Sequence, residues 1–520
     1  MSAAGNPARP GARPLPLLVG VGVAAFALVV RFVTRSPLWL DEALSVDIAR
    51  LPIGQIPEAL RHDGHPPLYY FLLHGWMAVF GESDVAVRAL SGVFGVAAIP
   101  LAWLAGRRAG GERLAWATAL VLALLPFAIR YSTETRMYSL VTLLVLAGEL
   151  LVRRVVDRRS APVPVLAGIA AVVGLLLLTH YWAIYLVAAT GLVLLWWARG
   201  GDRETRVLAA RVIGAGAVGA VLFLPWVPSF LSQAAHTGTP WATAARPTVV
   251  LNETLRDFGG GGTRAETGLL AATIVVLLLV GLFARDADGS STLALGRPSP
   301  AIAGEAAVAA LTLAIGTVAG IVTASTFAGR YASVIVPLVV LVVGRGLAVL
   351  PRPWPALGAG VVFAGFAVIG VAGNVLDERT QAGDLVAAIA PRFKAGDVVV
   401  DCPDQLGPAT RRALVHAGID PAALVVYPTL GDGDLVDWRD YRERNDAADP
   451  AALAAEVVAR VPAGHDVWVV WSGSYRTLEG DCEAFVSAIA QGMGQGELVV
   501  ADGASKYFEH ATLVRFGPTG

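Results

Sequence analysis

The sequence predicts a polytopic α-helical membrane protein with a soluble α/β domain at its C-terminus. Of its 520 residues, 55% are hydrophobic and only 16% are charged, whereas an ordinary globular domain carries about 25% charged residues. This apolar excess excludes a disordered or fibrous chain. The net charge of −1 does not create the basic field of a nucleic-acid binder, so we expect no nucleic-acid partner.

Apolar runs divide the chain at about residue 376. Before that point, eleven runs approach the ~20 apolar residues that cross a bilayer as a helix. After it, Asp, Glu, Gly and Pro are frequent and no run comes close to that length. We therefore expect a transmembrane domain over residues 1–376 and a soluble domain over residues 377–520. The predicted spans are 15–34, 86–106, 114–130, 137–152, 163–179, 183–198, 207–228, 267–284, 303–325, 331–350 and 356–374.

Arginines mark every second connection between these spans. They cluster, for example, at 107–113, 153–159 and 199–206, and positively charged loops remain in the cytoplasm. The N-terminus is therefore predicted to be cytoplasmic, and the C-terminal domain, which follows an odd number of spans, to be extracytoplasmic. Residues 34–37 (TRSP) offer no small-residue cleavage site, so we expect an uncleaved anchor in the cytoplasmic membrane.

One further apolar segment affects this count. Residues 65–80 (HPPLYYFLLHGWMAVF) open with two prolines and are shorter than a bilayer span. If the segment crossed the membrane, every later basic loop would lie outside. We therefore expect an interfacial or re-entrant helix on the outer surface.

The first outer loop, residues 35–85, carries the first candidate site. Asp41 and Glu42 are adjacent carboxylates just beyond the first span, where desolvation raises the pKa of a carboxylate towards the range of a general base. A pair of solvated interface charges would show the same pattern. Asp63 and His65 follow in the same loop and are candidates for binding the substrate or the donor phosphate. These four side chains could supply ligands to a divalent cation, but we assign no metal.

Later outer segments add cationic and aromatic candidates for binding a phosphate or sugar. Arg136 and Tyr138 lie in "IRYSTETRMYSL", and a guanidinium group matches the oxygens of a phosphate. The simpler alternative is a turn closed by an ion pair between Glu134 and Arg136. Arg330 and Tyr331 open the tenth span at its outer end, where the positive-inside rule does not call for arginine.

His180 lies between the fifth and sixth spans, in "LTHYWAIY". A hydrogen-bonded structural histidine is as good an interpretation as a ligand. The sequence has no phosphate-binding glycine loop and no zinc-type spacing of Cys and His. An active site on the outer face has no ATP or nucleotide sugar available, so we expect its donor to be carried by the membrane.

Together these features resemble the GT-C superfamily of membrane glycosyltransferases. More closely, they resemble glycosyltransferase family 39 with its bacterial relatives, the protein O-mannosyltransferases and the lipid A aminoarabinose transferases. The resemblance is carried by Asp41-Glu42, by residues 65–96 and by "YSTETRMYSL", with Arg330-Tyr331 in support. It covers residues 1–150 well and residues 150–375 only as a general pattern.

The resemblance implies an inverting transfer of a sugar, of the mannose or pentose class, from a polyprenyl-phosphate donor to a hydroxyl acceptor on the outer face. The acceptor would be a protein, a glycan or a lipid. Asp41 would deprotonate the acceptor, with Glu42 as its partner or substitute. Lipid A-modifying relatives have a Lys before the paired prolines, where this chain has His65. Arg136 and Arg330 are therefore the candidates to bind the departing phosphate, and a divalent cation could assist them.

Two other function classes compete with this interpretation. A transporter or flippase of lipid-linked sugars would place ionisable groups near the bilayer midplane, whereas here they gather in outer loops. A membrane hydrolase would need a nucleophile beside a base. Ser45, Ser132 and Ser139 have no His or Lys at a suggestive spacing.

The soluble domain alternates predicted strands and helices, which is typical of an α/β layered domain with a largely parallel sheet. We expect it to position the acceptor or dock a partner, without catalytic residues, and we expect Asp404 and His416 to be solvent-exposed. Cys402 and Cys482 could pair in an oxidising exterior or remain buried thiols. The predicted strands are 397–403, 467–473 and 498–503, and the predicted helices are 408–418, 450–461 and 482–493.

Overall fold

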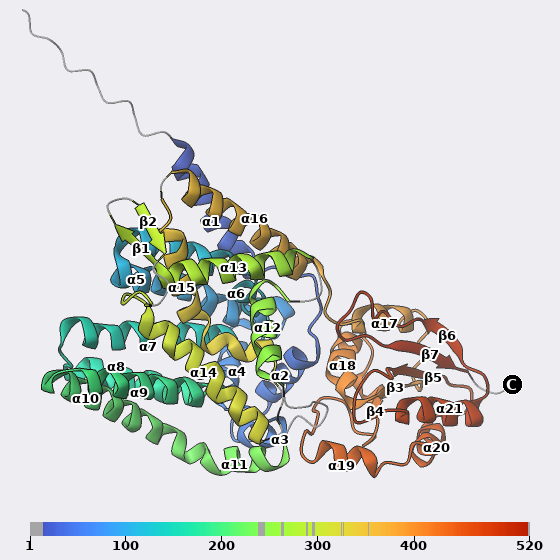
Figure 1. Cartoon of the computed structure of the whole chain (residues 1–520). Coiled ribbons are helices and arrows are strands. Elements are labelled where there is room, and N and C mark those ends of the chain that lie inside the picture. The colour runs from blue at the N-terminus through green and yellow to red at the C-terminus, as the bar shows by residue number, and fades with distance from the viewer. Residues whose placement is uncertain are drawn as a thin grey trace, which may run out of the picture.

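The computed structural model describes residues 14–237, 245–261, 265–287, 290–293, 297–323, 325, 327–351 and 353–517. A helical bundle extends from the N-terminal helix to α16, and an α/β domain lies at one end of it (Figure 1). Six helices of the described residues are long and apolar enough to cross a membrane, and four shorter apolar helices accompany them. The multi-span helical architecture is therefore confirmed, whereas the number of eleven crossings stays a prediction.

Each predicted span coincides with helix in the bundle. The predicted span 86–106 and the first part of 114–130 lie in one element, α5 (Asp84–Leu124), which is broken at Gly110 and Gly111, and the rest of 114–130 lies in α6. The left-handed φ of +80° at Gly111 suits a residue without a side chain, and the chain reverses there. The other helices of the bundle are α1 (Pro14–Val29), α6 (Pro126–Ser132), α7 (Tyr138–Arg158), α8 (Val163–Leu177), α9 (Trp182–Gly200), α10 (Arg203–Ala220), α11 (Val227–His236), α12 (Pro247–Phe258), α13 (Ala265–Phe283), α14 (Ala303–Val322), α15 (Val336–Ala348) and α16 (Trp354–Leu376), with α5 spanning Asp84–Leu124.

The first outer loop folds into three short helices, α2 (Leu40–Arg50), α3 (Ile56–Asp63) and α4 (Leu68–Phe80). The 13 residues of α4 are about 20 Å long, too short for a span. The short helix predicted for residues 65–80 is thus present. A 3-10 helix, η2 (Gly329–Val334), leads into α15 on the same side of the bundle.

The C-terminal domain is a three-layer sandwich around a five-stranded sheet of order β4-β3-β5-β7-β6. Along β3, Val399 packs with α17 and α18, whereas Val400 packs with α20 and α21, as the alternation of a strand requires. The strands are β3 (Val398–Cys402), β4 (Leu424–Val426), β5 (Val467–Trp471), β6 (Glu497–Val500) and β7 (Thr512–Phe516). The helices are α17 (Ala382–Ile389), α18 (Gly407–His416), α19 (Tyr441–Asp446), α20 (Pro450–Arg460) and α21 (Asp481–Met493).

The prediction of a largely parallel sheet is wrong for half of the sheet. β3 runs parallel to β4 and β5, but β7 runs antiparallel to both β5 and β6. After β6 the chain reverses direction, and its next strand, β7, therefore runs antiparallel to β6. The sequence pattern did not predict β7. The strand predicted at 498–503 is therefore an edge strand, β6, in an antiparallel pair.

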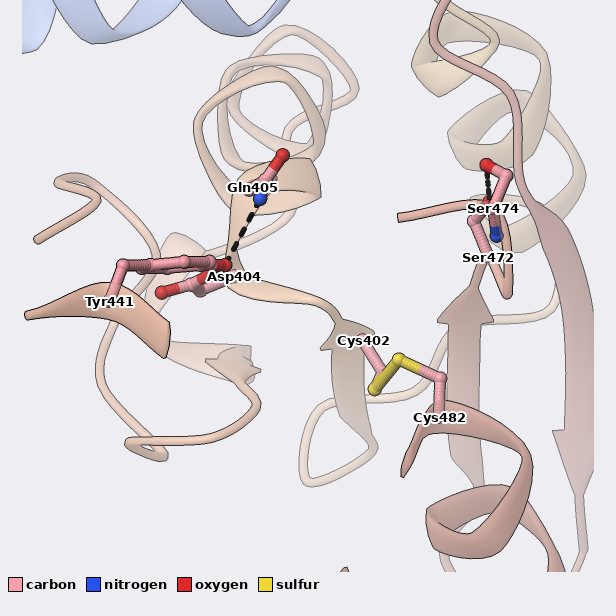
Figure 2. Close-up of a disulfide and its surroundings, with 7 residues drawn as sticks. All are labelled: Cys402, Asp404, Gln405, Tyr441, Ser472, Ser474 and Cys482. Atoms are coloured by element: carbon pink, nitrogen blue, oxygen red, sulfur yellow. Dashed lines mark hydrogen bonds between the residues drawn. A yellow bond between two sulfur atoms is a disulfide. The ribbon is translucent and has the colours of Figure 1, made fainter. Parts of the chain in front are cut away.

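A disulfide joins Cys402, at the end of β3, to Cys482, in the first turn of α21 (Figure 2). The paired alternative is therefore correct. Asp404 lies beside it and is not the exposed residue that we expected, because its side chain is buried and accepts a hydrogen bond of 2.6 Å from the Tyr441 hydroxyl. His416 is exposed, as predicted.

Replacing both cysteines with serine is expected to destabilise the C-terminal domain. The disulfide closes a loop with a sequence separation of 80, and restricting such a loop in the unfolded chain is worth about 4 kcal/mol. The measurement is the thermal unfolding midpoint of the full chain in detergent, with and without a reducing agent. A reducing agent should lower the midpoint of the wild type and leave the Ser variant unchanged. Equal midpoints for the two proteins without reductant would contradict the prediction.

Candidate active site

The predicted site residues converge where α2, the start of α7 and η2 meet. Asp41 lies in the first turn of α2, and its side chain is 17% exposed. Its Oδ2 is 3.1 Å from Nη1 of Arg330, which η2 carries. The sequence placed these two residues almost 300 positions apart, and the fold brings them into an ion pair.

Glu42, the neighbour of Asp41, has a different environment. It is fully buried, and Arg88 binds both of its oxygens, with Nε 2.7 Å from Oε1 and Nη2 2.6 Å from Oε2. The Thr135 amide also donates to Oε1 at 2.9 Å. Burial alone would raise the pKa of Glu42, but Arg88, together with Arg379 and the Thr135 amide, lowers it below its usual value. The alternative of two solvated interface charges is therefore wrong.

Asp63, His65 and Arg136 form a hydrogen-bonded chain. Nη2 of Arg136 donates to Nε2 of His65 at 2.8 Å, because a guanidinium group has no acceptor. His65 Nδ1 therefore carries the proton and donates to Asp63 Oδ2 at 2.7 Å. The Tyr70 hydroxyl donates to the same oxygen at 3.0 Å. These contacts make His65 a neutral link between an acid and a buried arginine.

The second guanidinium nitrogen of Arg136 points back to α2. Nη1 donates to the Ser45 hydroxyl at 3.1 Å and approaches the carbonyl oxygen of Asp41 at 3.4 Å. The alternative of a turn closed by Glu134 and Arg136 is wrong, because the carboxylate of Glu134 lies against Arg379 and Arg130 instead. Arg136 is thus fixed beside the acid pair.

An aromatic wall borders these groups. The His180 ring lies 5.7 Å from the Tyr138 ring and 5.7 Å from the Tyr331 ring, measured between centroids. The Trp182 amide donates to His180 Nδ1 at 3.2 Å, and burial lowers the pKa of His180 to about 3, so the ring is neutral. The Tyr138 hydroxyl is buried and has no hydrogen-bond partner among the described residues.

The sequence interpretation missed two site residues from the other domain. Arg379 is buried, and its Nη1 lies 3.5 Å from Glu42 Oε2 and 3.4 Å from Glu134 Oε2. Glu509 Oε1 accepts a hydrogen bond of 3.2 Å from the Leu40 amide at the start of α2. Arg379 could have been suspected from its position directly after the last span. Nothing in the sequence around Glu509 distinguishes it from any other acidic residue.

Two comparisons relate this chain to known proteins. Residues 64–228 match the family model described as dolichyl-phosphate-mannose-protein mannosyltransferase. The crystal structure of ArnT from Cupriavidus metallidurans in the apo state matches with a TM-score of 0.61 at 13% identity, over 97% of this chain and 100% of that one. The chain therefore has the fold of ArnT. The predicted resemblance to glycosyltransferase family 39 is thereby confirmed, with the sequence match confined to residues 64–228.

Two further structures have a similar fold. ArnT bound to undecaprenyl phosphate matches with a TM-score of 0.59 at 14% identity, over 98% of this chain and 100% of that one. An oligosaccharyltransferase of Archaeoglobus fulgidus, tethered to an acceptor peptide, matches with a TM-score of 0.50 at 11% identity, over 91% and 72% of the two chains. No curated protein matches the sequence significantly. The chain is a multi-pass integral membrane protein.

The four acidic and histidine candidates do not form a cation site in this fold. Glu42 is bound by two arginines, and Asp41 pairs with Arg330. Asp63 accepts a hydrogen bond from His65. Within the described ranges, no group of three or more His, Cys, Asp or Glu side chains is placed to share a metal ion. These side chains are better suited to binding arginines than to binding a divalent cation. No step of the reaction is therefore assigned to a metal.

A small cavity adjoins the aromatic wall of the helical bundle. It is lined by Trp182, Tyr185 and Phe327, by small residues of α14, and by Val250 of α12. The ring of Trp182 stacks against Tyr331 at 5.8 Å between centroids. The cavity therefore extends the site along an aromatic surface, with small and polar residues on its other side.

Glu509 gives the site a testable pH dependence. Burial, reinforced by the nearby charges of Asp41 and Glu42, raises its pKa to about 8, whereas a Glu in an unfolded chain titrates near ~4.3. Between these values the folded chain binds the extra proton, so the free energy of unfolding falls as pH rises from about 4 to about 8 and then levels off.

Thermal unfolding of the wild type and of Glu509→Gln checks this expectation. Because other buried groups titrate equally in both proteins, the difference between the two midpoints isolates Glu509. We expect the wild type to lose stability relative to the variant as pH rises through this window. A difference that stays constant from about pH 5 to about pH 8 would show that Glu509 titrates normally.

Proposed function

We propose that this chain is an inverting glycosyltransferase that moves a sugar from a polyprenyl-phosphate donor to a hydroxyl acceptor. The observation that carries this proposal is the contrast between the adjacent acids. Glu42 is fully buried and bound at both oxygens by Arg88, whereas Asp41 is partly exposed and pairs through one oxygen with Arg330. Asp41 is thus the carboxylate of the pair that can reach a substrate.

In the proposed reaction, Asp41 accepts the proton of the acceptor hydroxyl. The acceptor oxygen forms a bond to the anomeric carbon as the bond between that carbon and the phosphate oxygen breaks on the opposite face. The electron pair of the broken bond stays on the departing phosphate. A single displacement of this kind inverts the anomeric centre, and a positioned base typically contributes about 10²–10⁴-fold to the rate.

The departing phosphate needs fixed positive charge, which Arg330 and Arg136 can supply. Both guanidinium groups are held before the donor arrives, Arg330 by Asp41 and Arg136 by His65 and Ser45. Preorganised donors of this type stabilise charge that develops in the transition state. His65 is neutral in its hydrogen-bonded chain, so we assign it to orienting Arg136 rather than to neutralising the phosphate.

The remaining predicted residues take supporting roles in this proposal. Tyr138, with its unpartnered hydroxyl, can donate to the phosphate or the sugar. His180 and Tyr331 provide an aromatic face for the sugar ring and lead to the cavity beside Trp182. Glu42 binds Arg88 and Arg379, and Asp63 contacts Arg136 indirectly, through His65, so both acids are proposed as positioning residues. The role of Glu42 as a substitute base stays a prediction.

The donor proposal draws on the similar structures. ArnT of Cupriavidus metallidurans binds undecaprenyl phosphate, and the matching family model is that of enzymes that use dolichyl-phosphate mannose. Both ligands are polyprenyl phosphates. We therefore propose a polyprenyl-phosphate-linked sugar of the mannose or pentose class, with a protein, glycan or lipid as the acceptor.

We also propose that the site faces the outside of the cytoplasmic membrane. The disulfide between Cys402 and Cys482 supports this orientation, because such bonds persist in oxidising compartments. Protease added to intact cells should cleave a C-terminal tag, whereas an N-terminal tag should be cleaved only after lysis. The opposite pattern would reverse the proposed orientation.

Sugar transfer in proteoliposomes tests the proposed function. Radiolabelled polyprenyl-phosphate mannose and polyprenyl-phosphate pentoses are supplied with candidate acceptors, and both the labelled product and the free polyprenyl phosphate are measured. A glycosyltransferase breaks the bond between sugar and phosphate, whereas a flippase moves the donor across the bilayer with that bond intact. Movement of intact donor without any cleavage would favour the flippase.

Replacing Arg330 with Gln is expected to lower kcat about a hundredfold, because one fixed cation no longer stabilises the departing phosphate. The measurement is the initial rate of transfer at saturating donor. Arg35→Gln is the matched control, because Arg35 is exposed on the same side of the bundle and should retain the wild-type rate. Equal rates for Arg330→Gln and the control would remove Arg330 from the mechanism.

A further inference from the structure

The helix that carries Asp41 begins without a cap from its own segment. The four N-terminal amides of a helix need partners outside it, and polar side chains usually provide them. The N-cap residue of α2 is Trp39, which makes no capping hydrogen bond through its side chain. The Leu40 amide instead donates to Glu509 Oε1 at 3.2 Å, across a sequence separation of 469 residues. The C-terminal domain therefore caps α2.

The capping segment is itself anchored to the start of the C-terminal domain. The Glu509 amide donates to the Arg379 carbonyl at 2.8 Å, and the Gln381 amide donates to the Glu509 carbonyl at 2.9 Å. The Arg379 amide donates to the Ser36 hydroxyl at 2.8 Å. Two segments of the C-terminal domain are thus paired, and both contact the chain around the start of α2.

These contacts hold the residues on both sides of Asp41. Leu40, the residue before it, is bound by Glu509, and Glu42, the residue after it, lies 3.5 Å from the Arg379 guanidinium. The ring of Phe508 packs edge-on against the ring of Trp39 at 5.5 Å between centroids. The position of Asp41 relative to Arg330 therefore depends on contacts made by the C-terminal domain.

We propose that Glu509 is a positioning residue that holds the first turn of α2 so that Asp41 meets the acceptor and Arg330 in the reactive geometry. This inference rests on the proposed sugar transfer at Asp41. A terminal turn that loses its cap frays, and a displacement of about 1 Å at a reacting group can cost about 10²-fold in rate. The C-terminal domain is then a part of the catalytic centre, in addition to any role in docking an acceptor.

Two substitutions of Glu509 separate positioning from a merely structural role. Glu509→Ala removes the acceptor of the Leu40 amide. Glu509→Gln keeps an acceptor oxygen at the same place, and it also matches the protonated carboxyl that the raised pKa of Glu509 favours at neutral pH. Glu497→Ala is the control, because Glu497 is a half-exposed acid on the sheet edge of the same domain.

The expected result is a loss of kcat that the conservative variant rescues. Glu509→Ala should lower kcat for sugar transfer at least tenfold while the KM for the donor changes less than threefold, and Glu509→Gln and Glu497→Ala should stay within threefold of the wild type. Equal losses in the Ala and Gln variants, or a kcat of the Ala variant within threefold of the wild type, would overturn the proposal.

Amide hydrogen exchange gives a readout that does not need activity. Peptides that cover the first turns of α2 should exchange faster in Glu509→Ala than in Glu509→Gln, Glu497→Ala or the wild type. If the wild type transfers no sugar, the proposed function fails, and the exchange measurement still decides whether Glu509 orders α2. Unchanged exchange in Glu509→Ala would overturn the positioning role whatever the activity.

Leu40→Pro tests the same contact from its other side, and it replaces Glu509→Ala if that variant does not fold. Leu40 is the first residue of α2, a position that favours proline, and the extended backbone of Trp39, with φ −88° and ψ 174°, suits the residue before a proline. The substitution deletes the amide donor. Adding Glu509→Ala to Leu40→Pro should then lower kcat no further, and full additivity of the two losses would overturn the proposal.

Discussion

Asp41→Asn is expected to lower kcat for sugar transfer at least about a thousandfold, within the range that a general base contributes. The amide has the shape of the carboxylate but cannot take the acceptor proton. Asp41 is also the ion-pair partner of Arg330 at 3.1 Å, so the variant frees a guanidinium group for the phosphate. The donor should therefore bind at least as tightly as it does in the wild type, and the loss should appear in kcat rather than in KM.

Initial rates with saturating polyprenyl-phosphate sugar measure this effect. Asp47→Asn is the matched control, because Asp47 lies on the same helix and pairs with Arg50 at 2.7 Å, away from the acid pair. Detergent size-exclusion chromatography establishes that both variants fold. A well-folded Asp41→Asn that retains the wild-type rate would move the base to Glu42 or Asp63.

Arg88→Ala is expected to have the largest effect on stability. Glu42 is fully buried, and Arg88 binds both of its oxygens. Removing one partner of a buried ion pair leaves an uncompensated charge and typically costs about 3–5 kcal/mol. Arg88 also donates to the carbonyl oxygens of Ser36 and Pro37 at 2.7 and 3.0 Å, so the chain that leads into α2 loses its anchor as well.

The thermal unfolding midpoint in detergent measures this loss. Arg107→Ala is the control, because Arg107 and its partner Glu112 are both more than half exposed, and exposed pairs contribute about 0–1 kcal/mol. The double variant Glu42→Gln/Arg88→Met removes both charges and should recover much of the stability. A midpoint of Arg88→Ala equal to that of the control would show that the pair is not buried as described.

The carboxylate pair illustrates how far the candidate site could be predicted. Its position after the first span and the basic and aromatic residues of later loops were visible in the sequence, and the structure brings Asp41, Arg136 and Arg330 together. Which of the two acids is bound by Arg88 was not visible, because Arg88 lies 46 positions from Glu42. Both acids have the same local sequence environment, and only packing distinguishes them.

The sheet of the C-terminal domain shows the same limit for the fold. Short apolar runs separated by helices predicted the strands β3 and β5 and the layered arrangement. The direction of β7 depends on the path of the chain after β6, which apolar alternation does not encode. The prediction of a largely parallel sheet was therefore wrong for the half of the sheet that contains β7.

The lengths of the apolar runs were enough to identify a multi-pass membrane protein and to locate its helices. The length of an apolar run is a local property of the sequence, and it must match the thickness of the bilayer. It also determined which ionisable side chains were available outside the spans. The packing of the chain makes Asp41 accessible while Glu42 is neutralised. It also brings Arg379 and Glu509 of the second domain against the start of α2. Those outcomes depend on contacts between residues that are 46 to 469 positions apart, and such contacts exist only after the helices and the two domains have packed together.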